Sequence, residues 1–229
     1  MEHPAQFRAP GPPDLTSALW AQDYNEVKTI GQATGSPRTP EQSDIARFWA
    51  DSSRQAHRTW REISVTAGLS LEEKARLSAL LATVGSDALI ACWDTKYTYN
   101  FWRPVTAIPA GDSDDNPNTA PDSAWLPLLV TPNHPEYPSA HGCFSTATFT
   151  ALRRFLKTDR FEFTVDSAVP GVIQPVRSYS SFSQVIDEIS EARVYGGLHY
   201  RFSVRDGVTI GEKVAQYACK HFFQRAKQR

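Results

Sequence analysis

The sequence has few cysteines, little net charge and no long apolar run. Of its 229 residues, three are cysteine and one is methionine, and 24 basic side chains nearly balance 25 acidic ones. A formal net charge of −1 gives no indication of a nucleic-acid partner. No apolar run reaches the roughly 18 residues that predict a membrane span, so a membrane partner is not expected either.

The cysteines predict neither a disulfide framework nor a metal site. Cys92, Cys143 and Cys219 are odd in number, lack metal-ligand spacing and fall in segments that read as helical and partly apolar. They are interpreted as small core residues. Cys143 follows a histidine by two positions, but nothing near it marks a nucleophile of lowered pKa.

The N-terminal segment also lacks the basic and apolar regions of a secretory signal. We therefore expect either a cytoplasmic protein or a mature or trimmed form of a secreted one. Residues 1–38 are rich in Pro, Gly and Thr and predict an extended arm lying over its neighbour. Residues 39–229 are long enough for one domain with a sizeable core.

That domain is predicted to be all-α, a bundle of helices. Thr39 and Ser70 each begin a capping box, the second of which starts a long buried helix reaching about Tyr99. The helix after Thr39 is predicted to turn one apolar side inward, formed by Ile45, Phe48, Trp49, Trp60 and Ile63.

The second half of the chain alternates between loops and helices. Residues 109–138, rich in Pro and Asp, predict a long surface loop. Further helices are expected to begin at Ser139, Ser181 and Ser203, each as an N-cap. Only residues 161–165 alternate like a strand.

Three short segments place cations or hydrogen-bond donors at predicted helix ends. The first holds Lys96 and Arg103 within a markedly aromatic stretch. Burying both charges would be costly unless an anion met them. The alternative is that both side chains reach water beside an aromatic core.

The second segment is Ser139-Ala140-His141 at the start of a helix. The first amides of a helix have no internal acceptors and the dipole is positive there, so this is a ready anion site. The alternative is a plain N-cap. His141 lies in the first turn, where the dipole and nearby cations should lower its pKa and prepare it as an acid or base.

The third segment carries Arg193 near a helix end and His199 after a Gly-Gly turn. A guanidinium offers paired donors that suit a phosphate-shaped oxyanion. Taken alone, Arg193 could be a surface ion pair and His199 a loop histidine. All three segments in this order are less expected by chance than any one of them.

The ordered segments resemble the signature shared by type 2 phosphatidic acid phosphatases, bacterial acid phosphatases and vanadium-dependent haloperoxidases. The residues concerned are Lys96, Arg103-Pro104, Pro138-Ser139-Ala140-His141, Arg193 and His199. The surrounding text, WDTKYTYNFWRPVTAI, HPEYPSAHGCFS and ARVYGGLHYRF, is similar to the haloperoxidase branch in particular. The resemblance runs from about Pro12 onward and implies a helical bundle that binds vanadate, with phosphate able to occupy the same site.

It also implies roles for individual residues. His199 would be the vanadium ligand, and His141 the acid or base that handles the apical oxygen and the protons of hydrogen peroxide. The equatorial oxygens would be balanced by Lys96, Arg103 and Arg193 and would accept hydrogen bonds from Ser139 and the amide of Ala140. Lys96 would also polarise the peroxide. Halide would be oxidised to hypohalous acid, which reacts with a small organic acceptor.

His134 stands five residues before Ser139, where bromide-oxidising members carry histidine and chloride-oxidising members an aromatic residue. The resemblance thus favours bromide or iodide, with a catalytic role for His134. The alternative is that His134 only faces solvent in a Pro-rich loop.

Two other functions remain open at this point. In an acid phosphatase, His199 would attack phosphorus and His141 would protonate the leaving alcohol. A silent vanadate or phosphate binder is suggested by departures from the family pattern: Ala140 replaces a glycine, Ala192 a serine and Ser203 an aspartate.

The missing aspartate would have oriented a site residue. The orientation and pKa of His199 or Arg193 are therefore open, and Asp51 is a candidate partner for Arg193.

Relatives usually have additional helices ahead of the matching region. A homodimer is one way to cover the corresponding surface.

Overall fold

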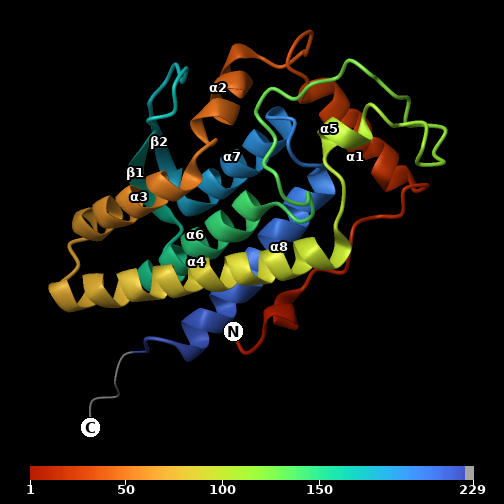
Figure 1. Ribbon diagram of the computed structural model, residues 1–229. Helices are drawn as coiled ribbons and strands as arrows, with labels where there is room; N and C mark the ends of the chain where they lie inside the picture. The colour runs from red at the N-terminus through yellow and green to blue at the C-terminus, as the bar shows by residue number, and fades with distance from the viewer. Residues whose placement is uncertain (225–229) are drawn as a thin grey trace.

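A computed structural model describes residues 1–224, apart from the side chains of residues 52–54. It is a helical bundle in which α4, α6 and α8 pack together, with α7 and α2 against one side and a β-hairpin behind (Figure 1). This confirms the predicted all-α helical bundle and adds one small sheet. The elements are η1 (Pro4–Phe7), α1 (Ala18–Ile30), α2 (Pro40–Phe48), α3 (Ser52–Thr66), α4 (Leu71–Tyr99), α5 (Pro104–Ala107), α6 (Ala140–Leu156), β1 (Arg160–Asp166), β2 (Val176–Ser181), α7 (Phe182–Tyr195) and α8 (Arg201–His221).

Helix α4 is the longest element and forms one wall of the core. The predicted capping box is present, because Ser70 accepts from the Glu73 amide while the Glu73 side chain accepts from the Ser70 amide. The stretch Leu71–Ala107 is long and apolar enough to cross a membrane by length and composition. Because α4 buries Leu77 and Leu81 against its neighbours, it has the features of a core helix of a folded domain.

The helix predicted after Thr39 is in fact two helices. Its capping box with Gln42 is present, but α2 ends at Phe48 and α3 begins at Ser52. Side chains of Gln55 and Ser167 donate to the Phe48 carbonyl at 2.7 and 3.1 Å, so the break is stabilised by groups that replace helical hydrogen bonds. The break brings the backbone of Trp49 toward the region where α6 and α7 meet.

The prediction of an extended arm over residues 1–38 is wrong for residues 18–30, which form α1. Ser17 caps this helix, and Trp20, Tyr24 and Val27 are buried at helical spacing. The Trp20 indole donates to Asp114 at 2.6 Å. Helix α1 therefore packs into the core and anchors the predicted long loop, which runs beside it in Figure 1.

The predicted strand at residues 161–165 is β1, and it pairs antiparallel with β2, which the sequence analysis did not identify. Strand β2 is polar in composition, but it buries Arg177 and Tyr179 in alternation. Arg177 is charge-paired with buried Asp44 at 2.9 Å, so a side chain that reads as exposed in sequence is part of the interior.

Close packing of α8 on α6 fixes the start of α6. A Cβ added at Gly207 would lie 2.6 Å from the Ser139 carbonyl, and one at Gly211 would lie 2.6 Å from the Cys143 carbonyl. The Ser139 amide donates to the Ser203 carbonyl at 3.0 Å. The glycines thus allow backbone contact at the N-cap and in the first turn of α6.

Gly207→Ala is expected to lower the free energy of unfolding by about 1–3 kcal/mol, because the new methyl overlaps a backbone oxygen that cannot move freely. Urea denaturation followed by circular dichroism measures this. Thr209→Ala, at an exposed position of the same helix, is the control and should be as stable as the parent. Equal losses in both variants would show that packing at Gly207 is not the cause.

Candidate functional site

The structure gathers the three predicted segments where several helices begin or end. Lys96 lies in the last turn of α4 and Arg103 immediately before α5. Ser139 caps α6, Arg193 is in the last turn of α7, and His199 precedes α8. These ends meet around the point where the long loop enters the bundle (Figure 1).

Arg103 connects the two histidines of the loop regions. Its Nη1 donates to the Leu198 carbonyl at 2.8 Å and lies 3.2 Å from His199 Nε2. Its Nε donates to the His134 carbonyl at 3.1 Å, and its Nη2 lies 3.1 Å from His134 Nδ1. A guanidinium only donates, so a hydrogen bond to Arg103 requires the lone pair of the ring nitrogen; His134 Nδ1 also lies 3.2 Å from the Pro135 carbonyl, which requires its proton instead.

Lys96 is completely buried and holds the loop that precedes α6. Its Nζ donates to the carbonyls of Pro135 and Glu136 at 2.8 Å and of Pro138 at 2.6 Å. Burial lowers the pKa of Lys96 to about 8. All three donors of the ammonium are thus engaged. Direct donation to an anion requires one of these carbonyl bonds to be exchanged.

Arg193 is a buried cation without a counter-ion. It is 2% exposed, its Nη1 lies 3.4 Å from the Trp49 carbonyl, and its Nε has no hydrogen-bond partner. None of the ion pairs described within residues 1–224 involves Arg193. Burial, followed by the charge of Arg103, lowers the pKa of Arg193 to about 9. Such a group is costly to bury unless an anion joins it.

The start of α6 provides further donors. Ser139 is the predicted N-cap and accepts from the Gly142 amide at 3.3 Å. The amides of Ala140 and His141 lie in the first turn, where no intrahelical acceptor exists. These are the groups that bind anions at helix N-termini.

His141 lies in this first turn beside Arg193. Its ring hydrogen bonds to the backbone of Trp49, while its Nε2 is buried and has no partner in the described part of the chain. Burial, followed by the charge of Arg193, lowers the pKa of His141 well below its usual value. The direction agrees with the sequence prediction and favours the neutral ring at neutral pH.

His199 pairs with a carboxylate that the sequence analysis missed. Its Nδ1 lies 2.7 Å from Glu136 Oε1, which also accepts from the Tyr200 amide at 3.1 Å. Burial raises the pKa of Glu136 to about 7 against the opposing effect of Arg103 and Lys96. The available signal was a glutamate among prolines, three residues before the predicted anion-binding serine.

Ser203 does not cap the last helix. Helix α8 begins at Arg201 with Tyr200 as N-cap, which corrects the prediction. The Ser203 hydroxyl instead lies 3.3 Å from His199 Nδ1. It therefore faces the ring whose orientation the sequence analysis left open.

The remaining predicted residue, His134, is half-buried beside the site. Its ring centroid lies 5.1 Å from that of Trp93. Burial, followed by the charges of Lys96 and Arg103, lowers its pKa to about 4. His134 is therefore neutral and does not simply face solvent.

The assembled groups suit an oxyanion better than a bare metal ion. Three buried cations, Lys96, Arg103 and Arg193, share the region with one buried carboxylate, Glu136. Nowhere in residues 1–224 do three or more His, Cys, Asp or Glu side chains cluster as a metal site would need. The excess positive charge and the helix amides favour a tetrahedral anion.

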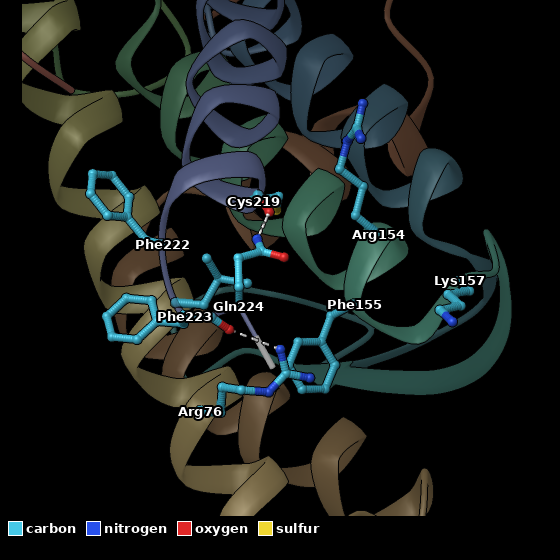
Figure 2. A pocket seen from close by; sticks show the side chains of 9 residues that line it. Arg76, Arg154, Phe155, Lys157, Cys219, Phe222, Phe223 and Gln224 are labelled. Carbon is cyan, nitrogen blue, oxygen red and sulfur yellow. Dashed lines mark hydrogen bonds between the residues drawn. The ribbon is translucent and has the colours of Figure 1, made fainter. Parts of the chain in front are cut away.

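A cavity lies at the opposite end of α6, and its features do not favour the binding of a tetrahedral anion. It has a volume of about 410 Å³, and Arg76, Arg154 and Lys157 lie around it together with Phe155 (Figure 2). A helix the length of α6 places it about 25 Å from Ser139. At a helix C-terminus the dipole is negative and favours basic side chains over bound anions.

Comparison with known proteins gives consistent matches. Residues 76–228 match the model for the VCPO second helical-bundle domain. Vanadium chloroperoxidase of Curvularia inaequalis is 25% identical over 260 residues, covering 83% of this chain and 42% of that protein.

Several solved structures match over 96% of this chain, and two of them are described below. The first bacterial vanadium-dependent iodoperoxidase has a TM-score of 0.82 at 29% identity, with 54% of its own chain covered. An apo-type bacterial vanadium-dependent chloroperoxidase has a TM-score of 0.81 at 20% identity, with 53% covered, which shows likeness of fold alone. The chain thus spans about half, or less, of the length of these relatives.

Proposed function

Because the chain belongs to the VCPO second helical-bundle domain family, we propose that it binds vanadate and carries out haloperoxidase chemistry. Halide would be oxidised by hydrogen peroxide to hypohalous acid, which reacts with a small organic acceptor. The family is the one that the signature residues predicted. The observation that carries the proposal is Arg193, a buried guanidinium for which the described residues provide no counter-ion, in a region with two other buried cations.

The residues present fit vanadate. His199 Nδ1 lies 2.7 Å from the Glu136 carboxyl group, so Nε2 would be the ring nitrogen that bonds the metal. Arg103 and Arg193 would balance the negative charge, and Ser139 with the amide of Ala140 would donate hydrogen bonds. When bound, vanadate would act as a Lewis acid that activates peroxide toward halide.

The chain's own groups would handle protons and charge. His141 Nε2, buried and unpartnered, would accept a proton from incoming peroxide and return it later. Lys96 would contribute positive charge and, after exchanging one carbonyl bond, a donor to the reacting oxygen. Phosphate would bind to the same cations and amides.

Bromide or iodide is proposed over chloride. His134 lies beside the candidate site, between Trp93 and Arg103, where its imidazole would offer a polar surface in place of a purely aromatic one. The similarity to a bacterial iodoperoxidase, at 29% identity over 96% of this chain, supports iodide as a substrate to test.

Phosphate-ester hydrolysis is the second candidate function. A histidine with Nδ1 bonded to a carboxylate presents a nucleophilic Nε2, which is the form that attacks phosphorus. The same geometry therefore supports phosphatase activity, and only turnover separates the two.

We expect the purified chain to brominate or iodinate a phenolic dye when supplied with halide, hydrogen peroxide and orthovanadate. Hydrolysis of phenyl phosphate is measured in parallel. Arg154→Met, at the distant cavity, is the control and should behave as the parent. Ester hydrolysis without halogenation would move the assignment to the phosphatase. Bound vanadate with neither activity would make the chain a binder.

A further inference from the structure

We propose that Glu136 is a positioning residue that fixes the tautomer and orientation of His199. The inference rests on the proposed function, in which His199 Nε2 is the vanadium ligand. It goes further by assigning a role to a residue outside the three signature segments.

The contact is short, buried and shared. Glu136 is 0% exposed, and its Oε1 accepts from His199 Nδ1 at 2.7 Å and from the Tyr200 amide at 3.1 Å. The second bond joins the carboxylate to the backbone next to the histidine. The ring and the chain segment that carries it are therefore held by the same oxygen.

The backbone of Glu136 is also fixed from two sides. Its amide donates to the Phe101 carbonyl at 2.9 Å, and its carbonyl accepts from Lys96 Nζ at 2.8 Å. Both partners come from the α4–α5 region, which also supplies Arg103. The carboxylate is thus preorganised and does not depend on a mobile loop conformation.

The consequence is a single tautomer of His199. A neutral imidazole in water favours the proton on Nε2, but an acceptor at Nδ1 places the proton there and leaves the Nε2 lone pair exposed. In the structure that lone pair lies 3.2 Å from Arg103 Nη1. Nε2 therefore faces the cationic side of the pocket, where an anion would be bound.

A neutral side chain beside His199 Nδ1 is not equivalent to the carboxylate of Glu136, because it carries no charge. Ser203, one turn into α8 from His199, brings a hydroxyl to 3.3 Å of Nδ1 but carries no charge. Glu136 supplies from the loop the negative charge that offsets part of the three-cation excess. Glu136 and Ser203 thus both lie against His199 Nδ1, at 2.7 and 3.3 Å, and only Glu136 can carry a charge.

The first test uses the unliganded parent protein, labelled with ¹⁵N at histidine. Two-dimensional NMR assigned with His199→Gln should show His199 with a protonated Nδ1 and an unprotonated Nε2. The opposite tautomer in the parent would overturn the proposal. Because no vanadate is present, this result is independent of whether the proposed function holds.

The second test compares three variants. Glu136→Leu removes the acceptor and should shift His199 to the Nε2-protonated tautomer and weaken vanadate binding by about 10- to 100-fold, as for other outer-shell partners of metal-bound histidine. Glu136→Gln keeps an acceptor and should retain the tautomer with a smaller loss. Glu162→Gln, an exposed carboxylate on β1, is the control and should match the parent.

Calorimetric titration of vanadate, with thermal melting of each variant, separates positioning from general stability. A lower melting temperature with the tautomer and affinity unchanged would mean that Glu136 is only structural and would overturn the proposal. If Glu136→Leu does not fold, the vanadate affinity of Glu136→Gln tests the proposal: a loss relative to the parent supports it, and an unchanged affinity overturns it. A parent that binds no vanadate would refute the proposed function and leave the tautomer result standing.

Discussion

Replacing Arg193 with methionine is expected to abolish oxyanion binding while making the unliganded protein more stable. Arg193 is buried with one long hydrogen bond and no ion pair in the described chain. An apolar side chain of similar length removes the desolvation cost; for comparison, replacing whole buried ion pairs by apolar side chains is often neutral or stabilising by about 1–4 kcal/mol. The cation that would pair with the anion is lost at the same time.

Thermal melting with and without phosphate or orthovanadate measures both effects. An anion that binds only the folded state raises the melting temperature of the parent, whereas Arg193→Met should show no such rise. Arg193→Lys should bind more weakly than the parent despite its charge, because the paired donor geometry is lost.

Arg154→Met provides the matched control, since Arg154 is an exposed arginine at the far end of α6. It should change neither the melting temperature nor the response to anions. Arg193→Met with the parent's vanadate affinity would place Arg193 outside the pocket. A large fall in its unliganded stability would instead mean that the guanidinium stabilises the fold.

The second large effect is expected from His199→Ala, which should remove the preference of the site for vanadate over phosphate. A bond from Nε2 to vanadium is the one contact that a resting phosphate does not make, while the cations and amides attract both anions alike. Vanadate affinity should fall to the level of phosphate affinity, which should itself change little. Competition between the two anions in calorimetric titrations measures this.

His3→Ala is the control, because His3 is exposed and its side chain makes no capping bond. Its selectivity should equal that of the parent. Retained vanadate preference in His199→Ala would exclude His199 as the ligand. Loss of phosphate binding as well would show that the histidine is needed to organise the pocket.

Local signals in the sequence were enough for most helices. The capping boxes at Thr39 and Ser70 act within one turn, so their residues predict the helix starts without knowledge of the fold. Helix α1 was missed because its flanks are rich in proline and glycine, although Trp20, Tyr24 and Val27 repeat at helical spacing. Strand β2 was missed because its inward arginine is buried only by pairing with distant Asp44.

The residues of the candidate site also fall into two groups, those that the sequence predicts and one that only the structure shows. The cations, the capping serine and the two histidines stand in recognisable segments, and their types alone predict an oxyanion pocket. Glu136 gave no comparable signal, because its role depends on His199, which lies 63 positions further along the chain.

The sequence by itself therefore determined the family and most of the helices, since these depend on neighbouring residues and on motif spacing, and the same motifs predict an oxyanion site. Only the tertiary structure decided which groups remain without partners and which are already engaged. Arg193 is left without a counter-ion, whereas Lys96 has all three donors occupied by the loop before α6. The reason is that burial and hydrogen-bond pairing are set by elements far apart in the chain, and these fix the free energy of each charge.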